Sequence, residues 1–319
     1  MQQRSLGRSG LRVSRLGLGT LTWGRDTDEH EARDQLTSFV EAGGTLLDTA
    51  AGYGDGASEE LLGSLLGEVV ARDDVVIATK AGIGRVRGER VTDLSRGRLL
   101  RTLDASLRRL GVDQVDLWQV HAWSDDVPLE ETLGALDTAV STGRAAYVGV
   151  SNHSGWQLAR SATWQECGPG RAPVTSQQVE YSLLNRTIEA EVLPAAQALG
   201  VGVLPWSPLG RGVLTGKYRT GTPADSRAAS PHFANFVGAY LNPRGHQVVE
   251  AVAAAADGLG WSPTEVALAW VRDRPGVTAP ILGARTAAQL RGSLTVEHCT
   301  LPAEIVTALD DVSGGEDGA

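Results

Sequence analysis

The sequence predicts a (β/α)8 barrel, and three observations carry the prediction. Short β-rich runs alternate eight times with longer helical patterns along the 319 residues. Most of these runs are continuously apolar, which is typical of parallel strands that helices cover on both sides. An α/β barrel of this length folds as one unit, so we expect residues 1–319 to form a single domain. The alternative is an open doubly wound sheet, which usually has fewer strands or a clear break in the pattern.

The predicted strands follow a short N-terminal hairpin. Residues 3–14 place Gly7 and Gly10 at a turn between two short runs, and we expect this hairpin to cap one end of the barrel. The eight runs that form the barrel lie at residues 15–20, 45–49, 75–80, 115–121, 146–152, 176–182, 201–207 and 277–284.

The helical patterns are amphipathic or begin at capping residues. Asp28 caps the stretch 28–42, and Ser58 begins the stretch 58–70, which has acidic residues in its first turn. Residues 95–110 carry leucines at i, i+3/i+4 spacing and end before a glycine. Further helices are expected at residues 130–142, 155–165, 188–199, 262–272, 286–293 and 303–312.

Composition argues against several classes of partner. The formal net charge is −9 and no block of like charge stands out, so nucleic acid and anionic membranes are poor partners. Cys167 and Cys299 have no metal-binding spacing and form no disulfide framework. The N-terminus lacks a signal peptide, and no run approaches the ~18 apolar residues of a membrane span. We therefore expect a cytoplasmic protein with a small-molecule ligand; its oligomeric state cannot be read from the sequence.

Polar groups end one predicted strand after another. In a barrel the chemistry lies at the C-terminal ends of the strands, so these side chains are expected to converge at one rim. In chain order they are Asp48, Tyr53, Lys80, His121, Ser151, Asn152, Gln178, Trp206, Gly283 and Arg285.

Four of these residues suit proton transfer to a carbonyl oxygen. The phenol of Tyr53 has an ordinary pKa near ~10, and we expect the Lys80 ammonium to lower it. Asp48 would hold Lys80 charged and in place, and His121 would position the carbonyl. This chemistry requires no nucleophile, so the electrons must come from elsewhere, and a hydride donor fits.

Two tryptophans are candidates for the substrate pocket beside Tyr53 and His121. Trp23 and Trp123 follow the runs 15–20 and 115–121, although ordinary loop packing explains both nearly as well. No metal site is expected, because the acidic pair after Trp123 lacks a second histidine or an ordered carboxylate spacing.

Seven segments together resemble the aldo-keto reductases, closest to the bacterial and potassium-channel β-subunit-like branches. The resemblance runs from about residue 3 to residue 293. Its segments read "LGRSGLRVSRLGLGT", "DTAAGYGDG", "VVIATK", "DLWQVH", "GVSN", "QVEYSLLNR" and "PWSPLGRGVLTGKY".

The resemblance implies an NADPH-dependent carbonyl reductase with a catalytic tetrad of Asp48, Tyr53, Lys80 and His121. Tyr53 would donate the proton, Trp206 would stack on the nicotinamide, and Arg285 would meet the 2′-phosphate. Residues implied to bind NADP(H) are Gly19, Thr20, Asp48, Ser151, Asn152, Gln178, Trp206, Ser207, Leu209, Arg211, Lys217, Gly283, Arg285 and Gln289. The long irregular stretch 207–242 is expected to fold over the bound cofactor.

One departure from the family bears on cofactor preference. Gly292 and Ser293 stand where the family usually has an acidic residue and an asparagine, so weaker adenosine contacts or weaker preference for NADPH over NADH are expected. Two alternatives stay open: a redox-sensing regulatory subunit that binds NADP(H) with little turnover, and a keto-sugar reductase of deoxysugar biosynthesis.

Overall fold

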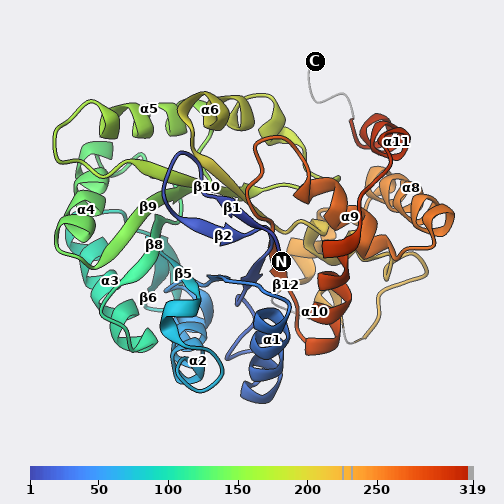
Figure 1. The fold of residues 1–319 in the computed structure, drawn as a ribbon, viewed down its shortest axis with the longest axis horizontal. Coiled ribbons are helices and arrows are strands. Elements are labelled where there is room, and N and C mark those ends of the chain that lie inside the picture. Colours follow the sequence, from blue (N-terminus) through green and yellow to red (C-terminus); the bar gives the residue numbers. More distant parts are fainter. Residues whose placement is uncertain (225, 231–232, 315–319) are drawn as a thin grey trace.

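The computed structural model describes residues 1–224, 226–230 and 233–314 and has an eight-stranded parallel barrel at its centre (Figure 1). Its strands are β3 (Gly17–Gly19), β4 (Leu46–Asp48), β5 (Val76–Ala81), β8 (Val115–Val120), β9 (Ala145–Ser151), β10 (Val174–Glu180), β11 (Gly202–Trp206) and β12 (Ile281–Gly283). The order around the sheet is β11-β10-β9-β8-β5-β4-β3-β12. A bridge between Val203 and Val277, with the Thr278 N–H 2.8 Å from the Val203 carbonyl, closes the ring. The predicted (β/α)8 fold is confirmed.

Helices surround the strands, as Figure 1 shows. They are α1 (Glu29–Glu41), α2 (Ala57–Leu65), α3 (Arg96–Leu110), α4 (Leu129–Ser141), α5 (Gly155–Glu166), α6 (Val192–Leu199), α7 (Ala234–Gly238), α8 (Pro243–Leu259), α9 (Pro263–Arg272), α10 (Ala287–Leu294) and α11 (Ala303–Ser313). The Asp28 carboxylate caps α1 by accepting the Glu31 N–H, and Gly111 ends α3 at a φ of 67°. Among the described residues, no helix combines the length and apolar character needed to cross a membrane.

The predicted N-terminal hairpin is present and closes the end of the barrel where the strands begin. β1 (Gln3–Ser5) pairs antiparallel with β2 (Arg12–Ser14), and Figure 1 shows both strands lying across the barrel. Leu6, Leu11 and Val13 pack against inward-facing side chains of the barrel strands. Gly7 has a φ of 57°, and a Cβ there would lie 2.4 Å from the Gly200 carbonyl oxygen. The hairpin therefore fits against the barrel only with glycine at the turn.

Two predicted helices have different bounds in the structure. The stretch 58–70 forms only α2, because Leu66 is extended and Gly67 has a φ of 82°. Ser58 does not cap this helix; it lies inside α2, and its hydroxyl donates to Thr20. The stretch 188–199 becomes helical only at Val192 after a 3-10 turn, which places Pro194 in the first turn, where its missing N–H is not needed.

Two elements of the structure had no counterpart in the sequence prediction. Helix α8 (Pro243–Leu259) lies in a part of the sequence where no helix was predicted. An antiparallel hairpin of β6 (Ile83–Val86) and β7 (Glu89–Thr92) follows β5. The stretch 207–242 is largely irregular, as predicted, and contains short 3-10 segments and α7; its residues 225 and 231–232 lie outside the described residues.

Candidate active site

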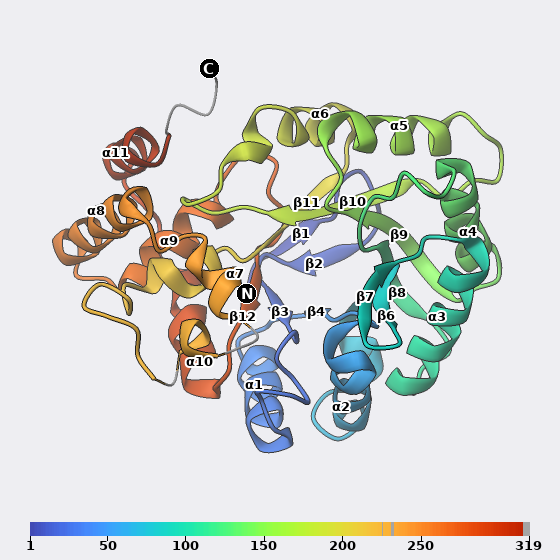
Figure 2. The same cartoon turned by 180° about the vertical axis from the view of Figure 1, so that it is seen from behind.

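A cavity of about 820 Å³ lies at the C-terminal ends of the barrel strands. Figure 2 looks at this end, with the β6–β7 hairpin and α7 on opposite sides of the barrel mouth. Most of the predicted site residues line the cavity, so the expected convergence at one rim is found. Those residues are Gly19, Asp48, Tyr53, His121, Ser151, Asn152, Gln178, Trp206, Ser207, Leu209, Arg211, Lys217, Gly283, Arg285 and Gln289.

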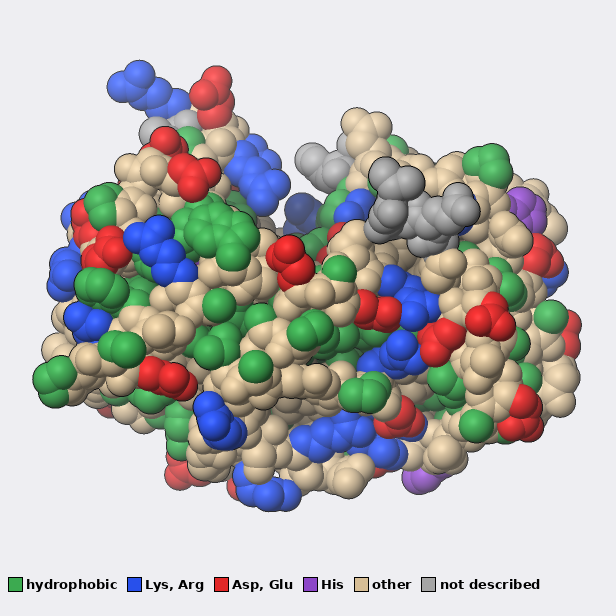
Figure 3. Space-filling view, turned by 90° about the horizontal axis from the view of Figure 1, so that it is seen from above, with side chains coloured by type: hydrophobic (Ala, Val, Ile, Leu, Met, Phe, Trp, Pro, Cys, Tyr) green, Lys and Arg blue, Asp and Glu red, His purple; other side chains and the backbone are tan. Residues whose placement is uncertain are grey.

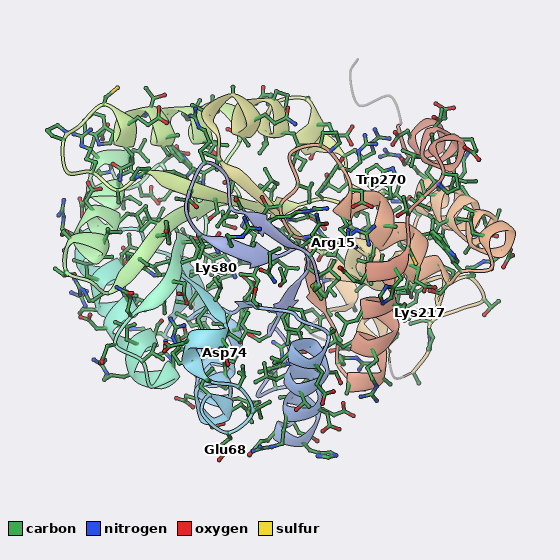
Figure 4. The ribbon with its side chains drawn as sticks, in the orientation of Figure 1. Arg15, Glu68, Asp74, Lys80, Lys217 and Trp270 are labelled. Carbon is green, nitrogen blue, oxygen red and sulfur yellow. The ribbon has the colours of Figure 1, made fainter. Side chains whose placement is uncertain are left out.

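A buried ion pair lies beneath the cavity floor. The Lys80 Nζ is 2.8 Å from Asp48 Oδ2, 2.7 Å from the Thr49 carbonyl and 3.4 Å from the Tyr53 hydroxyl. Gln178 donates its amide to the other Asp48 oxygen at 2.8 Å. The chain from Gln178 through Asp48 to Lys80 ends at the phenol, so it fixes the ammonium where it can interact with Tyr53. Figure 4 shows Lys80 among the barrel strands.

The pKa of Tyr53 differs from the sequence expectation. Burial in the cavity wall raises the pKa of the phenol, and the opposing effect of the Lys80 ammonium is not sufficient to lower it below the ordinary value. Burial also works to lower the pKa of Lys80, but Asp48 and Tyr53 outweigh burial and raise it. At neutral pH the site therefore holds a protonated phenol beside an ammonium.

His121 is neutral in this environment. Burial, together with the positive charges of Lys80 and Arg90, lowers the pKa of its imidazole to about 3. Its ring lies edge-on to Tyr53, with the centroids 5.9 Å apart. Its Nδ1 is buried without a hydrogen-bond partner among the described residues, so Nε2 is the nitrogen available to a ligand in the cavity. A neutral imidazole can donate one hydrogen bond to a carbonyl oxygen.

Asn152 joins the ends of three strands. Its backbone has a φ of 57°, a left-handed conformation that an asparagine tolerates. Its amide donates to the His121 carbonyl at 2.9 Å, and its Oδ1 accepts the indole N–H of Trp206 at 3.0 Å. These two bonds connect β9 with β8 and β11 at the rim, and they orient Trp206 along the cavity.

The opposite end of the cavity is lined by the loop after β11 and by α10. Lys217 and Arg285 both line it, and Figure 4 places Lys217 on the side where α8, α9 and α10 lie. The Arg211 guanidinium is bound to both Glu180 oxygens at 2.8 and 2.6 Å and to the Phe236 carbonyl at 2.7 Å. Arg211 therefore holds α7, through the Phe236 carbonyl, against β10.

Three of the predicted contact residues do not line the cavity. Trp23 is fully buried, with its indole N–H 3.0 Å from Gln35 Oε1, and its side chain is not part of the cavity wall. Thr20 is also buried, and its hydroxyl donates to the Asp48 carbonyl rather than facing the cavity. Trp123 lies outside the cavity lining, where its ring packs edge-on against His153 and Trp156.

Sequence reasoning did not single out Phe236 or Arg90, which both line the cavity. Phe236 stacks on Trp206 with centroids 6.4 Å apart and planes at 18°, but nothing in the irregular stretch 207–242 distinguished it. Arg90 lines the cavity from β7, a strand that was not predicted. The alternation of "RVRGERVT" around a central glycine is the signal that could have found this hairpin.

Comparison with known proteins identifies similar chains over nearly the whole length. The family model described as Aldo/keto reductase family matches residues 15–313. A Bacillus subtilis protein named uncharacterized oxidoreductase YrpG is 38% identical over 332 residues, which cover 100% of this chain and 98% of that protein. A rice protein named probable voltage-gated potassium channel subunit beta is 36% identical, with 89% and 87% of the two chains covered. L-glyceraldehyde 3-phosphate reductase of Escherichia coli K12 is 33% identical, with 99% and 94% covered.

Proposed function

This chain belongs to the aldo/keto reductase family, and from that premise we propose that it is an NADPH-dependent reductase of aldehydes or ketones, with Tyr53 as general acid. The observation that carries the proposal is the hydrogen-bonded chain from Asp48 through Lys80 to the Tyr53 hydroxyl, at the floor of a cavity that also holds a neutral His121. The relatives' names describe different roles, and no single substrate is common to them.

The residues around the cavity fit a dinucleotide cofactor. The cavity extends from Tyr53 past Trp206 to α10, so it accommodates an elongated ligand. Two cationic side chains, Lys217 and Arg285, line the end away from the phenol, where cofactor phosphates would lie. A Cβ added to Gly292 in α10 would meet no atom within 4 Å, which leaves room at the adenosine end. Trp206 and the amides of Asn152 and Gln178 would hold the nicotinamide end.

Tyr53 and the side chains around it would each have one task in the reaction: proton donation, orientation of the carbonyl, or stabilisation of charge. The reduced nicotinamide, when bound, supplies hydride to the carbonyl carbon. Tyr53 gives its proton to the carbonyl oxygen, which becomes the hydroxyl of the alcohol, and His121 orients that oxygen by donating a hydrogen bond. The negative charge left on the phenol oxygen is stabilised by the Lys80 ammonium 3.4 Å away. Asp48 and Gln178 keep that ammonium in position.

The test combines binding with turnover. Tryptophan fluorescence is titrated with NADPH and with NADH, and oxidation of NADPH is then followed with para-nitrobenzaldehyde as an activated substrate. Binding that prefers NADPH, together with turnover, supports the proposal. Tight binding of NADPH without turnover of this or other aldehydes contradicts it and favours a regulatory subunit that binds the nucleotide as a ligand.

A further inference from the structure

The β6–β7 hairpin carries an arginine pair that needs an explanation. Arg85 and Arg90 are direct cross-strand partners, so their side chains leave the same face of the hairpin. Both line the main cavity, on the side of Tyr53 and His121. Like charges placed directly opposite each other on two strands destabilise the pairing. A hairpin shaped by stability alone would not place two guanidinium groups at this position.

The rest of the chain neutralises this pair only weakly. Arg85 Nε is 3.8 Å from Asp55 Oδ1, and the two side chains are 59% and 67% exposed, so this ion pair contributes little. Arg85 otherwise donates to the Gly88 carbonyl within the hairpin. Within the part of the chain that the structure describes, Arg90 makes no ion pair with a carboxylate. Its charge acts instead on His121, whose pKa it helps to lower.

The surroundings of the hairpin add further positive charge. A second hollow of about 390 Å³ adjoins the main cavity and shares five lining residues with it, Gly52, Asp55, Ile83, Gly84 and Arg85. Arg98 and Arg101 of α3 also line this hollow, with Asp93 as a second carboxylate beside Asp55. Figure 3 shows Lys and Arg side chains along the edges of a hollow at the top of the view. This local excess of cations occurs in a chain whose formal net charge is −9.

We propose that Arg85 and Arg90 form an anion-binding subsite, so that the preferred substrates are carbonyl compounds that carry a phosphate or a carboxylate a few bonds from the carbonyl. This inference rests on the proposed function. With the carbonyl oxygen at Tyr53 and His121, the charged end of the substrate extends toward the hairpin, opposite to the end of the cavity where Lys217 and Arg285 lie. The two guanidinium groups are forked donors that suit either anion.

The experiment compares aldehydes that differ in charge. With saturating NADPH, kcat/KM is measured for para-carboxybenzaldehyde against its methyl ester, and for glyceraldehyde 3-phosphate against glyceraldehyde. The anionic member of at least one pair is expected to be preferred, and the preference should fall as salt is added. The first pair reports on carboxylate and the second on phosphate, so the two arms identify the anion.

Variants then assign the preference to the hairpin. In Arg85→Gln/Arg90→Gln, the ratio of anionic to neutral kcat/KM is expected to fall by about tenfold or more, chiefly through KM, because a charge-assisted hydrogen bond is lost at each position. Arg87→Gln is the matched control: this arginine lies at the turn of the same hairpin and lines neither hollow. The control is expected to keep the wild-type ratio, and NADPH binding by each variant confirms that the fold is intact.

The outcomes separate this inference from the proposal it rests on. Turnover of both members of each pair without preference for the anion overturns the subsite and leaves the reductase standing. A preference that survives in the double variant also overturns it, because the charge recognised would lie elsewhere. If no aldehyde is reduced although NADPH binds, the proposed function fails and the subsite fails with it.

Discussion

At the scale of single residues, the hydroxyl of Tyr53 is the group on which the proposed reaction depends. Tyr53→Phe removes the proton donor and keeps the ring that lies edge-on to His121. We expect NADPH binding to be retained and kcat to fall by about 10²–10⁴-fold, the usual contribution of a positioned general acid. Single-turnover reduction of an activated aldehyde measures the effect.

Tyr147→Phe provides the control for that substitution. Tyr147 belongs to β9, but it packs with the apolar cluster beneath the N-terminal hairpin, at the other end of the barrel. Loss of its hydroxyl should leave kcat unchanged. Wild-type turnover by the Tyr53 variant would mean that another group donates the proton.

The pKa values of His121 and Tyr53 predict the pH dependence of reduction. His121, with a pKa of about 3, stays neutral through the range near 6.5 in which an exposed histidine titrates. The raised pKa of Tyr53 keeps its phenol protonated to pH values above its ordinary ~10. We expect kcat/KM for reduction to be flat from weakly acidic to weakly alkaline pH and to decline only above that range. An inflection near 6.5 that disappears in His121→Gln would contradict the assignment of a neutral imidazole.

At the scale of secondary-structure elements, the Glu59 carboxylate joins α2 to α3 and β5. Glu59 is fully buried, and it accepts two hydrogen bonds from Arg109 of α3 and one from Thr79 of β5. Thr79 precedes Lys80, so this contact also supports the strand that carries the ammonium. The Glu59 carboxylate is tolerated in the interior because Arg109 and Thr79, from two neighbouring elements, satisfy its hydrogen bonds.

Removing the cation from that contact should be strongly destabilising. Arg109→Met leaves the Glu59 carboxylate buried without its counterion, and we expect a loss of about 3–5 kcal/mol in the free energy of unfolding. Adding Glu59→Gln should recover a large part of the loss, because the amide oxygen still accepts the Thr79 hydroxyl. Urea denaturation measures both variants. Arg108→Met, at an exposed neighbouring position of α3, is the control and should have little effect.

An element could be predicted from the sequence when its apolar residues formed a clear run or a clear periodic pattern. The barrel strands are continuous apolar runs, and their alternation with helices was sufficient to give the fold. Helix α8 has Asn242 as its N-cap, Pro243 at its first position and Gly260 at its end, but its apolar residues are mostly alanine and valine, so the periodic pattern was weak. The hairpin of β6 and β7 is short and charged, and such strands resemble a loop.

The site was predictable where a strand end fixed it, and unpredictable where side-chain direction decided it. Asp48, Lys80 and His121 end strands, and parallel strands bring those ends together. Trp23 also follows a strand, but its side chain turns into the core, and no local pattern records that direction. Phe236 reaches the cavity because Arg211 links α7, which carries Phe236, to Glu180 of β10, a contact between distant segments.

At the scale of the whole molecule, the two ends of the barrel have separate tasks. The N-terminal hairpin packs leucines into one end, where Gly7 allows it to lie against β11. The other end carries the cavity, and its charged groups lie on two sides of the Tyr53 site. The apolar packing of the hairpin and the cavity thus lie at opposite ends of the barrel, so substitutions that alter the cavity edge need not disturb that packing.

Two buried histidines make the stability of the whole fold dependent on pH. His153 is 4% exposed, and its Nδ1 lies 3.0 Å from the Ser151 carbonyl; burial lowers the pKa of its imidazole to about 4. His121 is likewise held neutral. The unfolded chain takes up protons on both rings as the pH falls below about 6.5, whereas the folded chain does not. Stability is therefore fully present above that pH and is lost as the pH falls toward 4.

Urea denaturation over a series of pH values tests this dependence. The free energy of unfolding should fall by up to about 1.4 kcal/mol per pH unit for His153 between pH ~6.5 and its folded pKa. His153→Gln should reduce that slope, although it also weakens the fold at neutral pH, since the glutamine does not reproduce the ring's packing against Trp123. His30→Gln, at an exposed position of α1, controls for the loss of a histidine as such. An unchanged slope in His153→Gln would mean that other groups set the acid sensitivity of this fold.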